Sequence, residues 1–284
     1  MPSIFVNQQN KLRNGWKILI FFINFAIALI VVNFLFRLFL PILNLTSNLL
    51  IDELIVLVSA IISTFVMMNF FEKKNLFDIG LTYTSKSPHE ILFGLILGFL
   101  MITIVVLPNA IFGYYKYNFT LNQIYPHFFE AVLFFVLVAL AEEILFRGYP
   151  FQRLIDGTSP IIATLLFSLI FSLAHLQNPN MNFLALFNIF LAGVWLSASY
   201  IKTRSLWLPI SLHFSWNFFQ GYLYSLPVSG TILVEPAFDV EISAENIISG
   251  GNFGPEGSLI TSLVLIIATI FILRNKRLSD AKIS

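Results

Sequence analysis

Three groups of polar residues interrupt the apolar stretches of this chain, and their types could support acid–base chemistry. These residues are Glu142, Glu143 and Arg147 in the first group, His175 in the second, and His213 with Asn217 in the third. A carboxylate and two imidazoles brought together at low dielectric can activate water, either as a general base or through a bound metal ion. Such a set favours hydrolysis of a peptide bond.

The spacing within each group indicates which side chains act together on a helix. Glu143 and Arg147 are four residues apart, so they can pair and leave Glu142 free of that pair. His213 and Asn217 have the same spacing and point toward one neighbouring helix. Each group also has an ordinary interpretation, as the end of a helix at the membrane interface or as a polar contact between helices.

Two catalytic arrangements remain open from these residues. In the first, Glu142 is the base on water, helped by His175, while His213 and Asn217 donate hydrogen bonds to the developing oxyanion. In the second, Glu142, His175 and His213 hold zinc and leave a fourth position open. The chain has no H-E-x-x-H motif, so zinc is possible and the cofactor is unknown. In both, Glu143 and Arg147 support Glu142.

The composition indicates that lipid is the solvent for most of the chain. Of its 284 residues, 57% are hydrophobic and only 11% are charged, and the mean hydropathy is +0.84. A net charge of +1 gives no reason to expect nucleic acid, and the lack of cysteine removes thiolate chemistry. We predict a cytoplasmic segment at 1–16, one membrane domain at 17–273 with a protease-like core at about 126–224, and a basic cytoplasmic tail at 274–284.

Apolar runs predict an all-α, polytopic fold with about eight transmembrane helices. The predicted spans are 17–40, 54–71, 91–112, 128–146, 161–176, 183–201, 206–224 and 258–273. Fourteen of the sixteen basic residues then fall on one face, and Arg37 and Lys116 are the exceptions. The positive-inside rule places that face, and both termini, in the cytoplasm. The acidic loop that carries Glu235 and Glu245 is then external.

Helix lengths allow the three groups to meet. If the helix bearing Glu142 continues past Arg147 to a turn at residues 156–160, Glu142 and His175 both lie roughly 21 to 23 Å above that turn. Gly148 and Pro150 weaken this expectation, because either could kink or end the helix.

The motifs E-E-x-x-x-R at 142–147, F-x-x-x-H at 171–175 and H-x-x-x-N at 213–217 resemble those of the CPBP intramembrane proteases. This family comprises CAAX prenyl proteases and bacteriocin-processing or immunity (Abi) proteins. A Gly-Pro-Glu-Gly run at 254–257 is also similar to bacterial members. The resemblance implies Glu142, His175, His213 and Asn217 as catalytic residues, in a cluster that opens to the cytoplasm. It also implies Glu143 and Arg147 beside them.

We therefore expect an intramembrane endopeptidase that acts on a membrane-embedded or lipidated peptide or protein in the cell membrane. Richness in Phe, Ile and Asn favours an AT-rich bacterial source. One alternative is a non-proteolytic bacteriocin-immunity or sequestering protein on the same scaffold. Another is a small transporter, against which the chain has no inverted-repeat pattern. The substrate and the metal dependence are not fixed by these residues.

Overall fold

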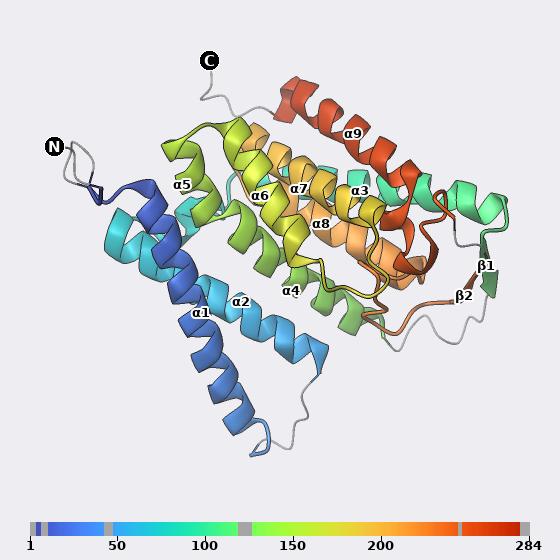
Figure 1. Ribbon diagram of the computed structural model, residues 1–284, viewed down its shortest axis with the longest axis horizontal. Helices are drawn as coiled ribbons and strands as arrows, with labels where there is room; N and C mark the ends of the chain where they lie inside the picture. The colour runs from blue at the N-terminus through green and yellow to red at the C-terminus, as the bar shows by residue number, and fades with distance from the viewer. Residues whose placement is uncertain (1–3, 7–10, 43–47, 119–126, 244–245, 279–284) are drawn as a thin grey trace.

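The computed structural model in Figure 1 is a bundle of helices, and the structure describes residues 4–6, 11–42, 48–118, 127–243 and 246–278. The helices are α1 (Asn14–Phe39), α2 (Leu49–Val66), α3 (Ser87–Ile111), α4 (Phe128–Arg147), α5 (Tyr149–Gly157), α6 (Pro160–Ala174), α7 (Phe183–Thr203), α8 (Trp207–Phe218) and α9 (Leu259–Arg274). Helix α2 continues as a π-helical turn, Met67–Glu72, and α8 continues as another, Phe219–Leu223. The predicted helical architecture is confirmed. Glu245 in the predicted acidic loop, residue 126 of the predicted core and parts of the segments 1–16 and 274–284 lie outside the described residues.

Two short strands depart from the all-α prediction. β1 (Tyr115–Asn118) and β2 (Asp239–Ile242) pair in antiparallel register, with Tyr115 opposite Ile242. Their residues alternate in burial or exposure along the strand, which is the pattern of a two-sided ribbon. The pairing ties the segment after α3 to the long segment before α9, an association between distant residues that local sequence patterns do not reveal.

The eight predicted spans each coincide with a helix, but eight crossings are not confirmed. Four helices are long and apolar enough to cross a membrane: Asn14–Phe39, Leu49–Glu72, Ser87–Ile111 and Phe183–Thr203. Helices α6 and α9 are apolar but have 15 and 16 residues, or roughly 22 to 24 Å, against about 30 Å of hydrocarbon. Large apolar side chains are exposed along α1, α3, α6 and α9, as lipid contact requires.

The expected continuous helix beyond Arg147 is wrong, because α4 ends at that residue and α5 begins at Tyr149. Gly148 leaves the helical region, with φ −74° and ψ −137°. Pro150 lies in the first turn of α5, where a missing backbone N–H costs nothing. Glu142 and His175 therefore line one cavity without the single straight hairpin that the sequence suggested.

Close packing of α3 on α8 positions the helix that carries His213 and Asn217. The small-xxx-small spacing of Gly94 and Gly98 predicts such a contact. A Cβ atom at Gly94 would lie 2.0 Å from Ser211 Oγ, and one at Gly98 would lie 2.7 Å from Ser215 Cβ. Ser215 Oγ also donates a hydrogen bond of 2.6 Å to the Leu95 carbonyl. The prediction of a helix seated closely on these glycines is confirmed.

Candidate active site

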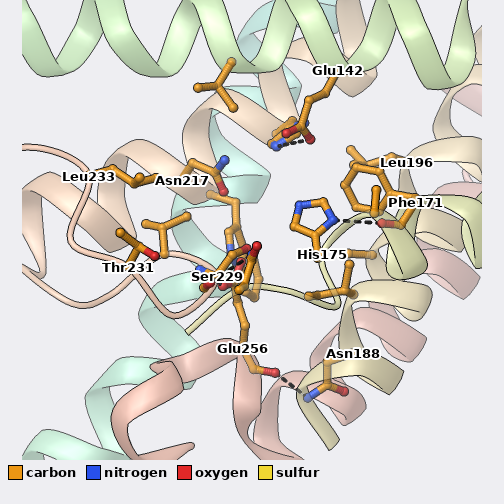
Figure 2. Close-up of a pocket in the computed structure, with 18 of the residues that line it drawn as sticks. Glu142, Phe171, His175, Asn188, Leu196, Asn217, Ser229, Thr231, Leu233 and Glu256 are labelled. Carbon is orange, nitrogen blue, oxygen red and sulfur yellow. Dashed lines mark hydrogen bonds and ion pairs between the residues drawn. The ribbon is translucent and has the colours of Figure 1, made fainter. Parts of the chain in front are cut away.

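All four predicted catalytic residues line one cavity of about 340 Å³. Its walls come from α2, α4, α6, α7, α8, the start of α9 and the segment 228–233. Figure 2 shows Glu142, His175, Asn217 and Glu256 around the same space, on different elements of the chain. The three motifs, although far apart in sequence, thus converge as expected.

Glu142 presents the carboxylate that is available for chemistry. Its side chain is 25% exposed, and its Oε2 atom accepts no hydrogen bond from any residue that the structure describes. Oε2 forms an ion pair with Nε2 of His213, at 3.8 Å. Glu143 projects about 100° away around the helix and is fully buried. Two adjacent glutamates therefore face different surroundings, one the cavity and the other the protein interior.

Glu143 and Arg147 form the predicted pair within α4. Arg147 Nη1 donates to Glu143 Oε1 at 2.9 Å, and both side chains are buried. Arg147 Nη2 donates to the Gly193 carbonyl of α7 at 3.2 Å, and the guanidinium lies 4.7 Å from the Phe171 ring centroid of α6. A buried ion pair needs such additional partners, because desolvation otherwise exceeds the attraction. Arg147 therefore joins α4, α6 and α7.

His213 lies between the two glutamates. Its Nδ1 atom is 2.9 Å from Glu143 Oε1, and its Nε2 atom faces Glu142. Because an ionised carboxylate only accepts hydrogen bonds, Nδ1 carries the hydrogen, an assignment made from the partner. Nε2 is then an acceptor in the neutral ring and a donor only in the imidazolium. Glu143 contacts His213 directly, and Arg147 pairs with Glu143, so this pair can support Glu142 by holding the His213 ring.

The F-x-x-x-H motif orients His175, which caps the C-terminal end of α6. His175 Nδ1 is 2.8 Å from the Phe171 carbonyl oxygen, and the two ring centroids are 4.8 Å apart. The carbonyl can only accept, so Nδ1 donates and Nε2 of the neutral ring keeps its lone pair. Figure 2 shows the His175 ring held by this hydrogen bond on the wall of the cavity.

Asn217 completes the predicted set, one helical turn after His213. The side chain is buried, lines the cavity and forms no hydrogen bond within the part of the chain that the structure describes. The π-helical turn Phe219–Leu223 follows it directly, a local feature that is frequent at functional sites. A buried amide without a partner costs free energy, so its NH₂ and carbonyl groups are available to a ligand in the cavity.

Two carboxylates that line the cavity, those of Glu53 and Glu256, were not predicted as site residues from the sequence. Glu53, in the first turns of α2, lies just before the predicted span 54–71, and the Asp52–Glu53 pair at the start of an apolar run was its signal. Glu256 belongs to the Gly-Pro-Glu-Gly run and accepts a hydrogen bond from the Ser229 backbone N–H. Burial raises the pKa of Glu256 above its ordinary value, against the lowering effect of that hydrogen bond.

The residues of the expected zinc set lie on the same cavity but are not grouped as ligands. Among the described residues, no group of three or more His, Asp or Glu side chains could hold a metal ion. Zinc coordination by Glu142, His175 and His213 requires ligand atoms about 2.0 to 2.2 Å from one ion. The arrangement as it stands does not fit this requirement, and zinc dependence stays a prediction from the sequence.

Comparison with known families agrees with the motifs. Residues 124–219 of the 284 match the family model described as type II CAAX prenyl endopeptidase Rce1-like. The matched segment contains Glu142, His175, His213 and Asn217, together with Glu143 and Arg147. The match confirms the resemblance to the CAAX protease family. No curated protein and no solved structure matches the chain.

Proposed function

We propose that this protein is an intramembrane endopeptidase that hydrolyses a peptide bond of a membrane-associated peptide or protein. The observation that carries the proposal is the Glu142 side chain, which lines the cavity shared with His175, His213 and Asn217 and whose Oε2 atom accepts no hydrogen bond from the described residues. The family match supports protease activity of the CAAX type. Apolar walls, formed in part by Phe134 and Leu265, suit a lipid-embedded or lipidated substrate.

Glu142 acts as the general base in the first step. Its carboxylate takes a proton from a water molecule, and the water oxygen attacks the carbonyl carbon of the scissile bond. His175 Nε2, left as an acceptor by the Nδ1–H contact with Phe171, accepts the second hydrogen of this water and orients it. The carbonyl π electrons move to oxygen, which becomes an oxyanion.

Asn217 and His213 stabilise this oxyanion. The Asn217 amide donates one hydrogen bond, and His213 Nε2 donates a second when the ring is an imidazolium. Glu143 and Arg147 hold the ring so that Nε2 stays directed toward Glu142 and the cavity. Glu142 then returns its proton to the leaving nitrogen as the C–N bond breaks, and a carboxylic acid and an amine result.

A cleavage assay tests this function. Purified protein in liposomes is incubated with a farnesylated C-a-a-X peptide and with the same peptide lacking the lipid, and products are identified by mass spectrometry. We expect Glu142→Gln to lower cleavage by about 10²- to 10⁴-fold, the usual contribution of a general base. The matched control is Glu241→Gln, since Glu241 is an exposed acid that pairs with Lys116 at 3.7 Å on β1.

The outcomes separate the protease from the sequestering alternative. Cleavage by the wild type and by Glu241→Gln, but not by Glu142→Gln, supports the proposal. Equal cleavage by Glu142→Gln and the wild type refutes the role of Glu142. Binding of the lipidated peptide without cleavage by any variant favours a sequestering protein.

A further inference from the structure

The bundle has two ends that differ in charge, and contacts between elements define the first. Here the N-terminal part of α1 meets the end of α2 through Lys17 and Glu72, at 2.7 Å. Arg153 of α5 reaches Glu72 at 3.4 Å, and Lys202 of α7 donates to the Leu273 carbonyl of α9 at 2.8 Å. We call this the basic end, and its Lys and Arg residues are Lys11, Arg13, Lys17, Lys73, Lys74, Lys86, Arg153, Lys202, Arg204, Arg274, Lys276 and Arg277.

The opposite end, which we call the acidic end, contains the end of α1, the start of α2, and β1 and β2. Arg37 pairs with Asp52 at 2.9 Å there. Figure 1 shows β1 and β2 far from the N-terminus of α1 and from α5. Within the described part of the chain, Arg37 and Lys116 are its basic residues, whereas its acidic residues are Asp52, Glu53, Glu130, Glu235, Asp239, Glu241 and Glu256.

The cavity reaches the surface toward the acidic end. Leu49, at the start of α2, is 50% exposed and lines the cavity, as do the partly exposed Asn178 and Thr231. Asn178 follows α6 and donates to the Ser229 carbonyl at 3.0 Å, so both belong to this rim.

Toward the basic end the cavity is closed. The layer beneath Glu142 and His213 consists of the buried Glu143, Arg147 and Phe171, and Arg147 contacts the other two. A hydrogen bond from Arg147 to the Gly193 carbonyl extends the layer to α7. A polar peptide segment therefore has a route to Glu142 from the acidic end and none through this packed layer.

Charge asymmetry then fixes the side of the membrane. Lys and Arg residues close to membrane-spanning helices accumulate on the cytoplasmic side, which assigns the basic end to the cytoplasm. We infer that the cavity is entered from the extracytoplasmic side, and that its substrates are membrane-anchored peptides with a scissile bond in that half of the membrane. This differs from the cytoplasmic opening that the family resemblance implied. The substrate part rests on the proposed function, whereas the direction of the opening does not.

The natural absence of cysteine makes the direction measurable. Three single-cysteine variants report on three places: Ile232→Cys at the rim, Ser85→Cys at the basic end, and Ala192→Cys on the cavity wall. Ile232 is 63% exposed and Ser85 is exposed, so neither change removes a buried contact. Each variant is expressed in bacteria and treated with a small membrane-impermeant thiol reagent, in intact spheroplasts and after lysis.

We expect Ile232→Cys and Ala192→Cys to react in intact spheroplasts and Ser85→Cys to react only after lysis. The reverse pattern, or equal labelling of all three before lysis, would overturn the inference. Lack of reaction at Ala192→Cys under both conditions would show that the cavity is closed to water and would also overturn it. Labelling does not depend on proteolysis, so its failure and the failure of the proposed function are separate results.

Discussion

Glu142 and Glu143 are adjacent and chemically identical, yet the structure predicts opposite consequences when each is changed to glutamine. Glu143 Oε1 is shared by Arg147 and His213 at 2.9 Å from each, in a fully buried environment. Glutamine keeps the shape but removes the charge that balances Arg147. Removal of one partner of a buried ion pair costs about 3 to 5 kcal/mol, so we expect Glu143→Gln to lose about that much free energy of unfolding.

Glu142 carries no comparable interaction. Its contact with His213 is 3.8 Å long, Oε2 accepts no hydrogen bond among the described residues, and a quarter of the side chain is exposed. Glutamine keeps the shape of the side chain and removes no hydrogen bond at Oε2, so we expect Glu142→Gln to lower the free energy of unfolding by less than about 1 kcal/mol. Its cleavage activity should nevertheless fall by the larger factor, because the base itself is lost.

The assay compares both variants with the wild type in one detergent. Unfolding is followed by circular dichroism during denaturant titration, and cleavage is measured at a temperature where all three proteins are folded. There, Glu143→Gln should keep partial activity, reduced by about 10- to 100-fold through misorientation of His213. The reasoning is refuted if Glu142→Gln is the less stable variant, or if Glu143→Gln is as stable as the wild type.

Three further predictions follow from other contacts. Gly98→Leu should weaken the α3–α8 packing and lower both thermal stability and activity, because its Cβ alone would lie 2.7 Å from Ser215 Cβ. The matched control is Gly15→Leu, since nothing lies within 4 Å of a Cβ added at Gly15, and it should leave both unchanged. Burial raises the pKa of Glu256 above its ordinary value of 4.5. The protonated side chain therefore contributes stability that is complete below pH 4.5 and is lost as the pH rises through the folded-state pKa. In Glu256→Gln, the fall in the free energy of unfolding over this pH range should be smaller than in the wild type. Cleavage should persist after a chelator has removed metal from the protein, with removal checked by elemental analysis. Loss of cleavage on chelation and its return only when Zn²⁺ is added would instead support zinc bound by Glu142, His175 and His213.

Local geometry explains which features the sequence could predict. The Glu143–Arg147 pair and the shared direction of His213 and Asn217 follow from the helical repeat, and the structure contains both. Close packing at Gly94 was predictable for the same reason, since small residues one turn apart form a groove. Apolar runs likewise located a helix at each predicted span.

Long-range packing explains the rest. Glu53 and Glu256 enter the cavity from α2 and from the segment before α9, and nothing in their local sequence specifies which helices they face. The break at Gly148 depends on whether a glycine two residues before Pro150 continues or ends a helix, which neighbouring elements decide. The pairing of β1 with β2 joins residues more than 100 positions apart. Patterns within one segment cannot reveal such associations.

The separate motifs form one physical unit, and this unit supports the proposal that Glu142 is the general base. Phe171 contributes its carbonyl to His175 and its ring to Arg147, and Arg147 pairs with Glu143, which in turn binds His213. These contacts hold the two imidazole rings in place and give the buried polar groups of Glu143 and Arg147 partners inside the protein. Glu142 lies at the edge of this network without a hydrogen bond to Oε2. A general base must accept and release a proton in each cycle, and a carboxylate with an oxygen free of hydrogen bonds, on the same cavity as two oriented imidazoles, meets that requirement.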